Sequence, residues 1–281
     1  MDYMHKFNEN PFQDLYWNLG EQTKETINLI GGNSQNFRMS VKIAEYMTSK
    51  YHVNIKVVLP DALKGKLPPF DNIIYMPSTD SGSFDNSDQF KELVSAADYN
   101  LLIGEFSKNS ITEKAVASAC DSKGKIVITR DGVDLLAGFK PEKSLMNENL
   151  IIFSSMPQLQ KLLRAVYYPK VLLLTQSLMQ VSEILHKFTL SFPVTVITLH
   201  DGQILVSKNG LTHIIPLSKT GYSPLTIWNG ELAAKITVMN LFNPDNVLNA
   251  TTAALFSWFV FLRKFLFDVD SVAGNVVTAL R

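Results

Sequence analysis

The sequence predicts an α/β fold in which helices cover both faces of a central, mostly parallel sheet and a β-hairpin follows late in the chain. From residue 26 onward, short apolar runs alternate with segments of helical periodicity, a pattern typical of βαβ units. His200-Asp201-Gly202-Gln203 has the composition of a tight turn between two such runs, which predicts the hairpin. Neither an internal repeat nor a Pro/Gly/Ser-rich linker divides the 281 residues, so we expect one domain.

Strands are expected where an apolar, often β-branched run ends at glycine, proline or a polar residue. These runs cover residues 26–30, 53–59, 72–75, 100–103, 125–129, 149–153, 171–175, 194–200 and 203–207. Helices are expected where apolar residues recur every three or four positions. They cover residues 39–51, 90–96, 111–121, 157–167, 181–188, 231–242 and 246–267. Because helical crossovers return the chain to the same end of a sheet, the strands they connect should pair in parallel.

Residues 1–25 differ from the rest of the chain because they are polar with a few embedded aromatic residues. Phe12, Tyr16 and Leu19 recur near helical spacing, which predicts a short amphipathic segment that packs on its own domain or on a neighbouring subunit. We therefore divide the chain into an N-terminal extension, residues 1–25, and a single domain, residues 26–281.

Composition limits the classes of function. The 26 Lys and Arg balance 26 Asp and Glu, so the chain lacks the basic excess expected of a nucleic-acid-binding protein. Its single cysteine, Cys120, forms no internal disulfide and suits a reducing cytosol. The most apolar run, residues 253–262, is too short for a bilayer, which needs about 20 residues. His186, His200 and His213 lack the spacing of metal ligands. We expect a soluble, cytoplasmic protein with no membrane or nucleic-acid partner and no metal site built by the chain.

Six short motifs stand at the ends of predicted strands or the starts of predicted helices. They are Gly31-Gly32-Asn33, Gly104-Glu105-Phe106, Thr129-Arg130-Asp131, Ser155-Met156-Pro157-Gln158, His200-Asp201-Gly202 and Trp228-Asn229-Gly230-Glu231. Their order and spacing resemble the ribokinase-like fold. They look most like the motifs of the ATP- or ADP-dependent NAD(P)H-hydrate dehydratases, which repair hydrated nicotinamide cofactors. The resemblance covers about residues 26–265.

The resemblance implies a nucleotide site and a substrate site, with Glu231 as the carboxylate that accepts a proton from the substrate hydroxyl. The residues implied to contact the nucleotide are Asn229, Gly230, His200 and Gly202, and those implied to contact the substrate are Gly31, Gly32, Asn33, Gly104 and Asp131. The implied ligands are ATP or ADP with magnesium, and hydrated NAD(P)H. A homo-oligomer is also expected.

The motifs depart from the family pattern where phosphoryl transfer is most demanding. Trp228 stands at a family glycine, where an indole would fill space that a phosphate needs, and Glu231 stands at a family aspartate. The extra methylene displaces the carboxyl by roughly 1.5 Å, and a misplacement near 1 Å can cost about 100-fold in rate. An alternative interpretation is that Asn229 and Gly230 only cap a helix whose dipole suits Glu231.

Three functions stay open at this point. The first is a divergent NAD(P)H-hydrate dehydratase-like enzyme with weak or no turnover. The second is a protein that binds a nucleotide without turnover, and the third is an oligomer-forming member of the ribokinase-like superfamily.

Overall fold

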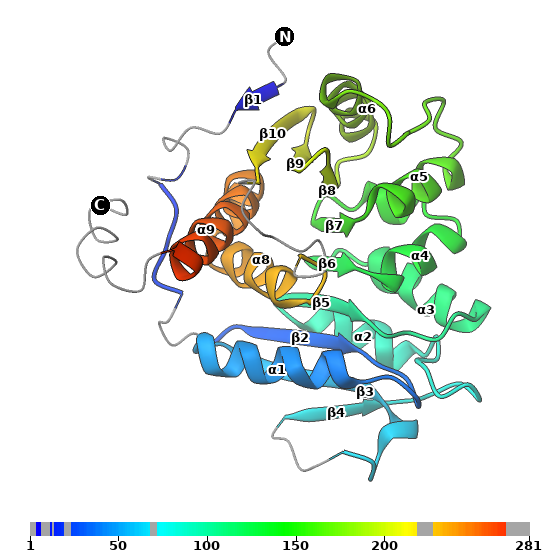
Figure 1. Ribbon diagram of the computed structural model, residues 1–281. Helices are drawn as coiled ribbons and strands as arrows, with labels where there is room; N and C mark the ends of the chain where they lie inside the picture. Colours follow the sequence, from blue (N-terminus) through cyan, green and yellow to red (C-terminus); the bar gives the residue numbers. More distant parts are fainter. Residues whose placement is uncertain are drawn as a thin grey trace.

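The computed structural model describes residues 4–6, 12, 14–19, 24–67, 72–217 and 227–267. Among these residues, ten strands form one sheet (Figure 1). They are β1 (Met4–Lys6), β2 (Thr26–Gly31), β3 (Asn54–Pro60), β4 (Ile73–Met76), β5 (Tyr99–Gly104), β6 (Ile126–Thr129), β7 (Leu150–Ser154), β8 (Thr195–His200), β9 (Gln203–Lys208) and β10 (Leu211–Pro216). Their order across the sheet is β1-β10-β9-β8-β7-β6-β5-β2-β3-β4.

The sheet is parallel except at the hairpin. The strands from β4 to β8 pair in parallel throughout. β9 is antiparallel to both β8 and β10, with His200 opposite Gln203 across the predicted turn. β1 pairs in parallel with β10 at the outer edge. This topology confirms the predicted sheet and its late β-hairpin.

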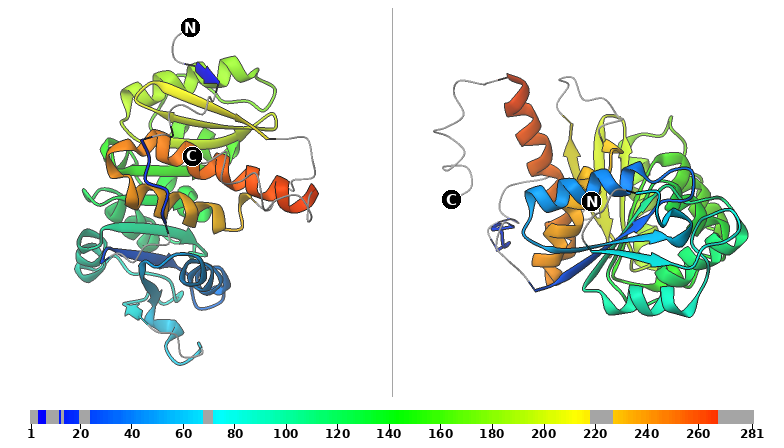
Figure 2. Two further views of the ribbon diagram at one scale, coloured as in Figure 1. Left: turned by 90° about the vertical axis from the view of Figure 1, so that its left-hand side faces the viewer. Right: turned by 90° about the horizontal axis from the view of Figure 1, so that it is seen from below.

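Helices cover both faces of the sheet, as predicted. The α-helices of the described residues are α1 (Arg38–Lys50), α2 (Asp88–Ala96), α3 (Ser110–Cys120), α4 (Asp131–Gly138), α5 (Met156–Ala165), α6 (Leu178–Ser191), α8 (Glu231–Phe242) and α9 (Val247–Phe267). Figures 1 and 2 show α1, α8 and α9 on one face and α2 to α6 on the other. Successive residues of a strand enter opposite cores, so that Leu29 packs with the first group of helices and Ile30 with the second. Strands buried on both faces read as continuous apolar runs, which is why most of them could be predicted.

Residues 171–175 form a loop, and the strand predicted there is wrong. β7 pairs directly with β8, so the sheet has no place for another strand between them. The segment instead connects α5 to α6, and its Leu172 amide donates to the side chain of Gln160. An apolar run of five residues satisfies the strand pattern, but the pattern does not say whether a partner strand is available.

Three elements were not predicted from the sequence, namely β1, β10 and α4. In β10, Thr212 and His213 interrupt the apolar run. α4 is eight residues long and begins at Asp131, only two positions after β6 ends at Thr129. The Asp131-Gly132 pair at that boundary is typical of a turn, so the sequence does not indicate that a helix begins there.

Phe12 and Tyr16 of the N-terminal extension pack on the corner between α8 and α9 of their own chain. Phe12 lies 6.1 Å from Phe256 and Tyr16 stacks on Phe242 at 5.5 Å, measured between ring centroids. The side chain of Asn243 holds the backbone of Tyr16: its Oδ1 accepts from the amide at 2.7 Å and its Nδ2 donates to the carbonyl at 3.0 Å. Residues 14–19 form no helix, so the helical spacing of the aromatic residues was misleading. Phe12 and Tyr16 nevertheless pack on helices of their own chain.

Asn243→Ala should lower the free energy of unfolding by about 2 kcal/mol, because it leaves both backbone groups of Tyr16 without this partner. Chemical denaturation measures the loss. Asn249→Ala is the control, since Asn249 bonds only to Asn246 at an exposed site and should lose less than about 0.5 kcal/mol. Equal losses in the two variants would contradict a role for Asn243 in holding the extension.

Candidate functional site

The parallel strands β2, β5, β6, β7 and β8 end at one edge of the sheet, and the first turn of α8 lies at the same edge, packed on β5 and β6. Ligands of open α/β sheets bind outside the carboxyl ends of the strands. Most of the residues singled out from the sequence lie along this edge.

The Gly31-Gly32-Asn33 motif fastens the turn after β2 to the end of β5. A Cβ added to Gly31 would come within 2.6 Å of the Gly104 carbonyl oxygen, so only glycine fits. The Gly32 amide donates to that same oxygen at 3.0 Å. Asn33 is buried, and its Nδ2 donates to the carbonyl of Glu105 at 2.6 Å. These three residues therefore have a structural function in the turn.

Asp131 is held by the backbone that follows β5. Its Oδ1 accepts from the amide of Glu105 at 2.9 Å, and its Oδ2 accepts from the amide of Phe106 at 2.8 Å. Gly104 lies against this carboxylate with φ +100°, and a Cβ there would overlap Asp131 Oδ1. Burial raises the pKa of Asp131, although both backbone amides oppose that rise. The structure thus brings Asp131 and Gly104 together in a closed contact, and their contact with a substrate stays a prediction.

Glu105 follows β5, and its carboxylate lies at the first turn of α1. Its Oε2 accepts from the Met39 amide at 2.9 Å. Anions bind at helix N-termini because the amide groups there point outward and the helix dipole favours negative charge. Here the chain's own carboxylate takes that position. Burial raises the pKa of Glu105, and neighbouring Arg130 works against this rise.

Arg130 reaches from the end of β6 to the start of α8. Its Nη1 donates to the carbonyl of Trp228 at 3.0 Å, and its backbone has φ 56° and ψ −138°, a conformation that residues with a Cβ rarely adopt. Among the described residues, the buried Arg130 Nε has no hydrogen-bond partner. A strained backbone and an unsatisfied buried donor occur more often at functional sites than elsewhere.

The Trp228-Asn229-Gly230-Glu231 motif starts α8. The ring of Trp228 packs on Phe153 at the end of β7, with centroids 4.7 Å apart. Asn229 Oδ1 accepts from the Glu231 amide at 3.0 Å. Gly230 has φ +88°, and a Cβ there would lie 2.9 Å from Ile43. Asn229 therefore caps an amide in the first turn of α8, and the backbone at Gly230 approaches α1 closely.

The carboxylate of Glu231 is turned toward α1, where its Oε1 lies 3.1 Å from Lys42 Nζ. No hydrogen bond or ion pair of the described residues joins Glu231 to Asp131 or Arg130. The three side chains share one edge of the sheet but not one bonded cluster.

His200 and Gly202 lie at the hairpin. The Nε2 of buried His200 is 2.7 Å from the carbonyl oxygen of Gln176, just before α6. A Cβ at Gly202 would meet nothing within 4 Å. Neither contacts the start of α8 through a hydrogen bond of the described residues.

Ser155 and Gln158 form a capping box at the start of α5. Gln158 Nε2 also donates to the carbonyl of Arg130 at 2.7 Å. Gln158 therefore supports the unusual backbone of Arg130.

Arg130, Glu105 and Lys42 were not predicted as site residues. The signal available for Arg130 was a charged residue directly after an apolar strand, in the motif that the resemblance had already marked. Nothing in the sequence pairs Lys42 with Glu231, which is 189 positions later, because that contact depends on how α1 and α8 cross.

No family model and no curated protein matches the sequence. Solved structures do match the fold. Bacillus subtilis YxkO, a member of the UPF0031 family, superposes with a TM-score of 0.59 at 11% identity over 93% of this chain and 91% of that one. The ADP/ATP-dependent NAD(P)H-hydrate dehydratase from Bacillus subtilis, co-crystallized with ATP/Mg²⁺ and soaked with CoA, gives 0.55 at 11% identity over 88% and 85% of the two chains.

The chain therefore has the ribokinase-like fold, as the motif order predicted. At 11% identity the similarity establishes the fold, and an activity has to be argued from the site itself. Within the described residues, no three His, Cys, Asp or Glu side chains gather as metal ligands. None of the described helices has the length and apolar character needed to cross a membrane.

Proposed function

We propose that the chain is a divergent NAD(P)H-hydrate dehydratase-like protein that binds ATP or ADP at the start of α8 and turns over its substrate weakly or not at all. The observation that carries this proposal is the ion pair between Glu231 and Lys42. Proton transfer needs a carboxylate within hydrogen-bond reach of the substrate hydroxyl. Lys42 competes with that hydroxyl for the only carboxylate that the resemblance assigns to the step.

Two cations, Arg130 and Lys42, lie near the start of α8 and would be the groups that bind a phosphate. Both now face carboxylates, Arg130 near Glu105 and Asp131 and Lys42 paired with Glu231, so a phosphate would have to compete with these.

The space beside Gly104 is filled by Asp131 and Arg130, and the space beside Gly230 by Ile43 and Ile103. A phosphate would therefore reach the backbone there only after these side chains move. When bound, a nucleotide would supply the phosphoryl group, and magnesium would be held largely by its phosphate oxygens.

Trp228 supports weak turnover. Its packing on Phe153 places an indole at the ends of β6 and β7, beside the first turn of α8 where developing charge would need backbone amides. Arg130 is bonded to the carbonyl of the same residue. A ligand that reached these amides would have to displace or share both contacts.

The alternative function, a non-catalytic nucleotide-binding or oligomer-forming protein, differs from the first in turnover and assembly. The homo-oligomer stays a prediction, and light scattering of the full chain would measure it.

Calorimetry and thermal unfolding with ATP or ADP and Mg²⁺ test the proposal. At a nucleotide concentration 100 times Kd, mass action should add about 2.7 kcal/mol of stability. Trp228→Gly combined with Glu231→Asp should tighten binding, and Arg130→Ala should weaken it about tenfold, the scale of one charge-assisted contact. Arg164→Ala, an exposed arginine on α5, is the matched control and should bind like the wild type.

Turnover is measured separately by the spectrophotometric recovery of NADH from its hydrate, with ATP and with ADP. We expect a rate near background for the wild type. A flat thermal and calorimetric response to both nucleotides would overturn the binding part of the proposal. Robust turnover that Glu231→Gln leaves unchanged would place the chemistry at other residues.

A further inference from the structure

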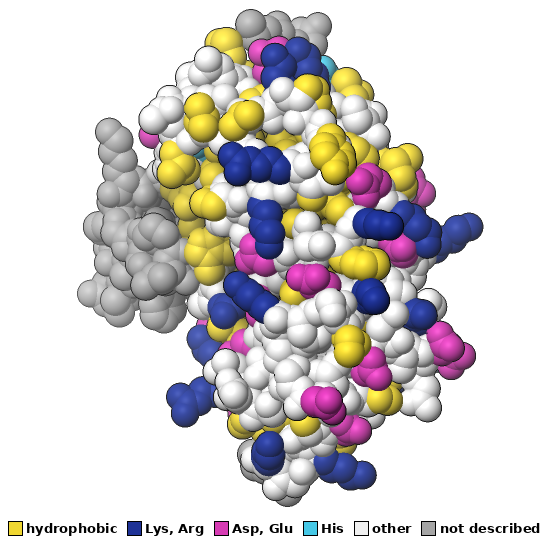
Figure 3. Space-filling model, turned by 90° about the vertical axis from the view of Figure 1, so that its right-hand side faces the viewer, with side chains coloured by type: hydrophobic (Ala, Val, Ile, Leu, Met, Phe, Trp, Pro, Cys, Tyr) yellow, Lys and Arg dark blue, Asp and Glu magenta, His cyan; other side chains and the backbone are white. Residues whose placement is uncertain are grey.

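The connection between α5 and α6 exposes a group of apolar side chains on the face opposite α1, α8 and α9. Tyr167 is 91% exposed, Leu174 73% and Leu173 52%, and Met179 at the start of α6 is 51% exposed. In Figure 3, hydrophobic side chains are denser on the half of this face that α5 and α6 cover. Apolar residues gathered in this way mark an interaction site more often than isolated ones do.

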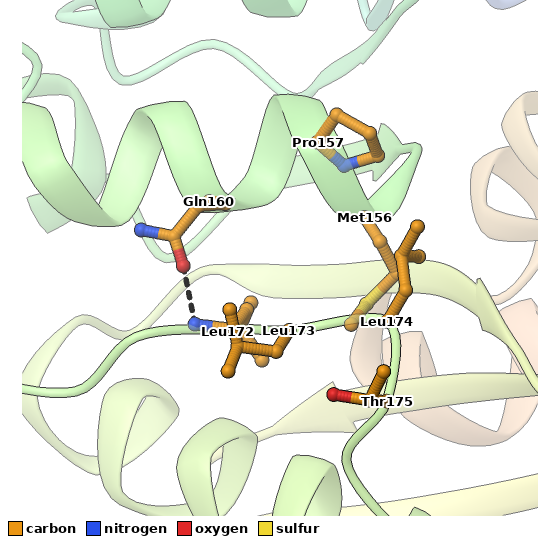
Figure 4. A pocket seen from close by; sticks show the side chains of 7 residues that line it. All are labelled: Met156, Pro157, Gln160, Leu172, Leu173, Leu174 and Thr175. Atoms are coloured by element: carbon orange, nitrogen blue, oxygen red, sulfur yellow. Dashed lines mark hydrogen bonds between the residues drawn. The ribbon is translucent and has the colours of Figure 1, made fainter.

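A hollow of about 320 Å³ lies within this group (Figure 4). Met156 and Pro157, at the start of α5, line one side, and the side chains of Leu172, Leu173 and Leu174 line the other. The size suits one or two side chains of a partner, and a hollow accepts an inserted group in a way that a flat surface does not.

Gln160 contributes a polar side chain to the wall of the hollow. Its Oε1 accepts from the Leu172 amide, so this contact holds the leucine segment beside α5. Its Nε2 has no hydrogen-bond partner among the described residues, but the atom is buried and points away from the leucines in Figure 4. The lining that a partner would meet in the hollow is therefore apolar.

Basic residues outnumber acidic ones around the hollow. Residues 149–182 contain no Asp or Glu, whereas Lys161, Arg164 and Lys170 are basic and exposed. The acids of the adjoining helices, Asp134 and Glu183, are paired with Lys161 and Lys187. In the described part of the chain, neither Arg164 nor Lys170 forms an ion pair. A basic rim of this kind selects an acidic partner.

We propose that this hollow docks an acidic protein segment, which inserts one apolar anchor side chain of the leucine or phenylalanine type between α5 and residues 172–174. The anchor takes the apolar lining, and flanking carboxylates face Arg164 and Lys170. The hollow favours a peptide over a lipid surface, because it can receive one inserted side chain of a partner.

Fluorescence anisotropy with labelled peptides tests the docking on the full chain. The probes carry Leu-Phe-Leu between glutamate flanks, and the matched probes carry either three central alanines or lysine flanks. We expect saturable binding of the first probe alone. Leu174→Asp should weaken it at least about tenfold, as loss of an anchor contact does, and Lys170→Glu should weaken it by a factor that shrinks as salt rises.

Ile111→Asp is the control, because Ile111 is an exposed apolar residue in the first turn of α3, remote in sequence from the hollow. It should bind the probe like the wild type. Two results would overturn the proposal. The first is no saturable binding of the Leu-Phe-Leu probe, or equal binding of all three probes. The second is co-sedimentation with phosphatidylglycerol vesicles, abolished by Leu174→Asp, without peptide binding, which would make the surface a membrane contact.

Discussion

Gly104→Ala should lower the free energy of unfolding by about 4 kcal/mol or more. The new Cβ would overlap Asp131 Oδ1 and approach Arg130, and an alanine would also have to adopt φ near +100°. The left-handed backbone alone costs about 1–2 kcal/mol. Displacing the carboxylate leaves the amides of Glu105 and Phe106 without their acceptor, at about 1–3 kcal/mol each.

Gly65→Ala separates these contributions. Gly65 also has a positive φ, +80°, but a Cβ there would meet nothing within 4 Å. Denaturant unfolding of both variants should therefore show only the backbone cost at Gly65, about 1–2 kcal/mol. If the two variants lose the same stability, the closed contact between Gly104 and Asp131 is absent in solution.

Lys235→Met should stabilise the protein by about 3 kcal/mol at pH 7. Lys235 lies in α8, largely buried, and burial, together with the nearby charge of Lys50, lowers its pKa to about 8. No hydrogen bond or ion pair among the described residues involves it. Methionine keeps the length of the side chain and removes the charge that the folded state must desolvate.

The effect of Lys235 should depend on pH in a defined direction. Below pH 8 the amine is charged in both the folded and the unfolded chain, so the folded state carries the full cost. Between pH 8 and about 10.5 the folded state has lost the proton and the unfolded state still holds it, so wild-type stability rises with pH. Above that range the advantage of the variant should vanish.

Denaturant unfolding at pH 7, 9 and 11 measures this trend. Lys91→Met is the control, because Lys91 is an exposed lysine on α2 that is paired with Asp88. Its stability difference from the wild type should stay within about 0.5 kcal/mol. The same pH dependence in both variants would contradict the buried environment of Lys235.

Most of the fold could be predicted because the order of its strands and helices follows from local patterns of apolar residues. The hairpin turn at Asp201 and Gly202, and the buried strands, follow from periodicity and turn composition. The predictions that failed concern pairing between segments far apart in the chain. Residues 171–175 have a strand pattern without a vacant place in the sheet, and β1 has no pattern of its own but gains three partners on β10.

The motifs marked from the sequence could be placed in the fold, but their contacts could not be predicted. Gly31 and Gly104 end β2 and β5, Asp131 starts α4 and Gly230 precedes α8, and close approach excludes a Cβ at each of these glycines. Arg130 and Glu105 were missed because their contacts depend on which helix lies near each side chain: α8 begins beside Arg130, and α1 begins beside Glu105. Such contacts follow from packing between elements far apart in the chain, which no short motif encodes.

The pairing of β1 with β10 sets an order for folding during synthesis. Met4 lies beside Thr212 in the finished sheet, so the first strand to leave the ribosome must wait roughly 10–40 s for its partner, at about 5–20 residues per second. The sheet from β2 to β7 can assemble in that interval. β1 can dock only once β10 has been made, and it then covers a strand edge of β10 that would otherwise be open to pairing with another chain.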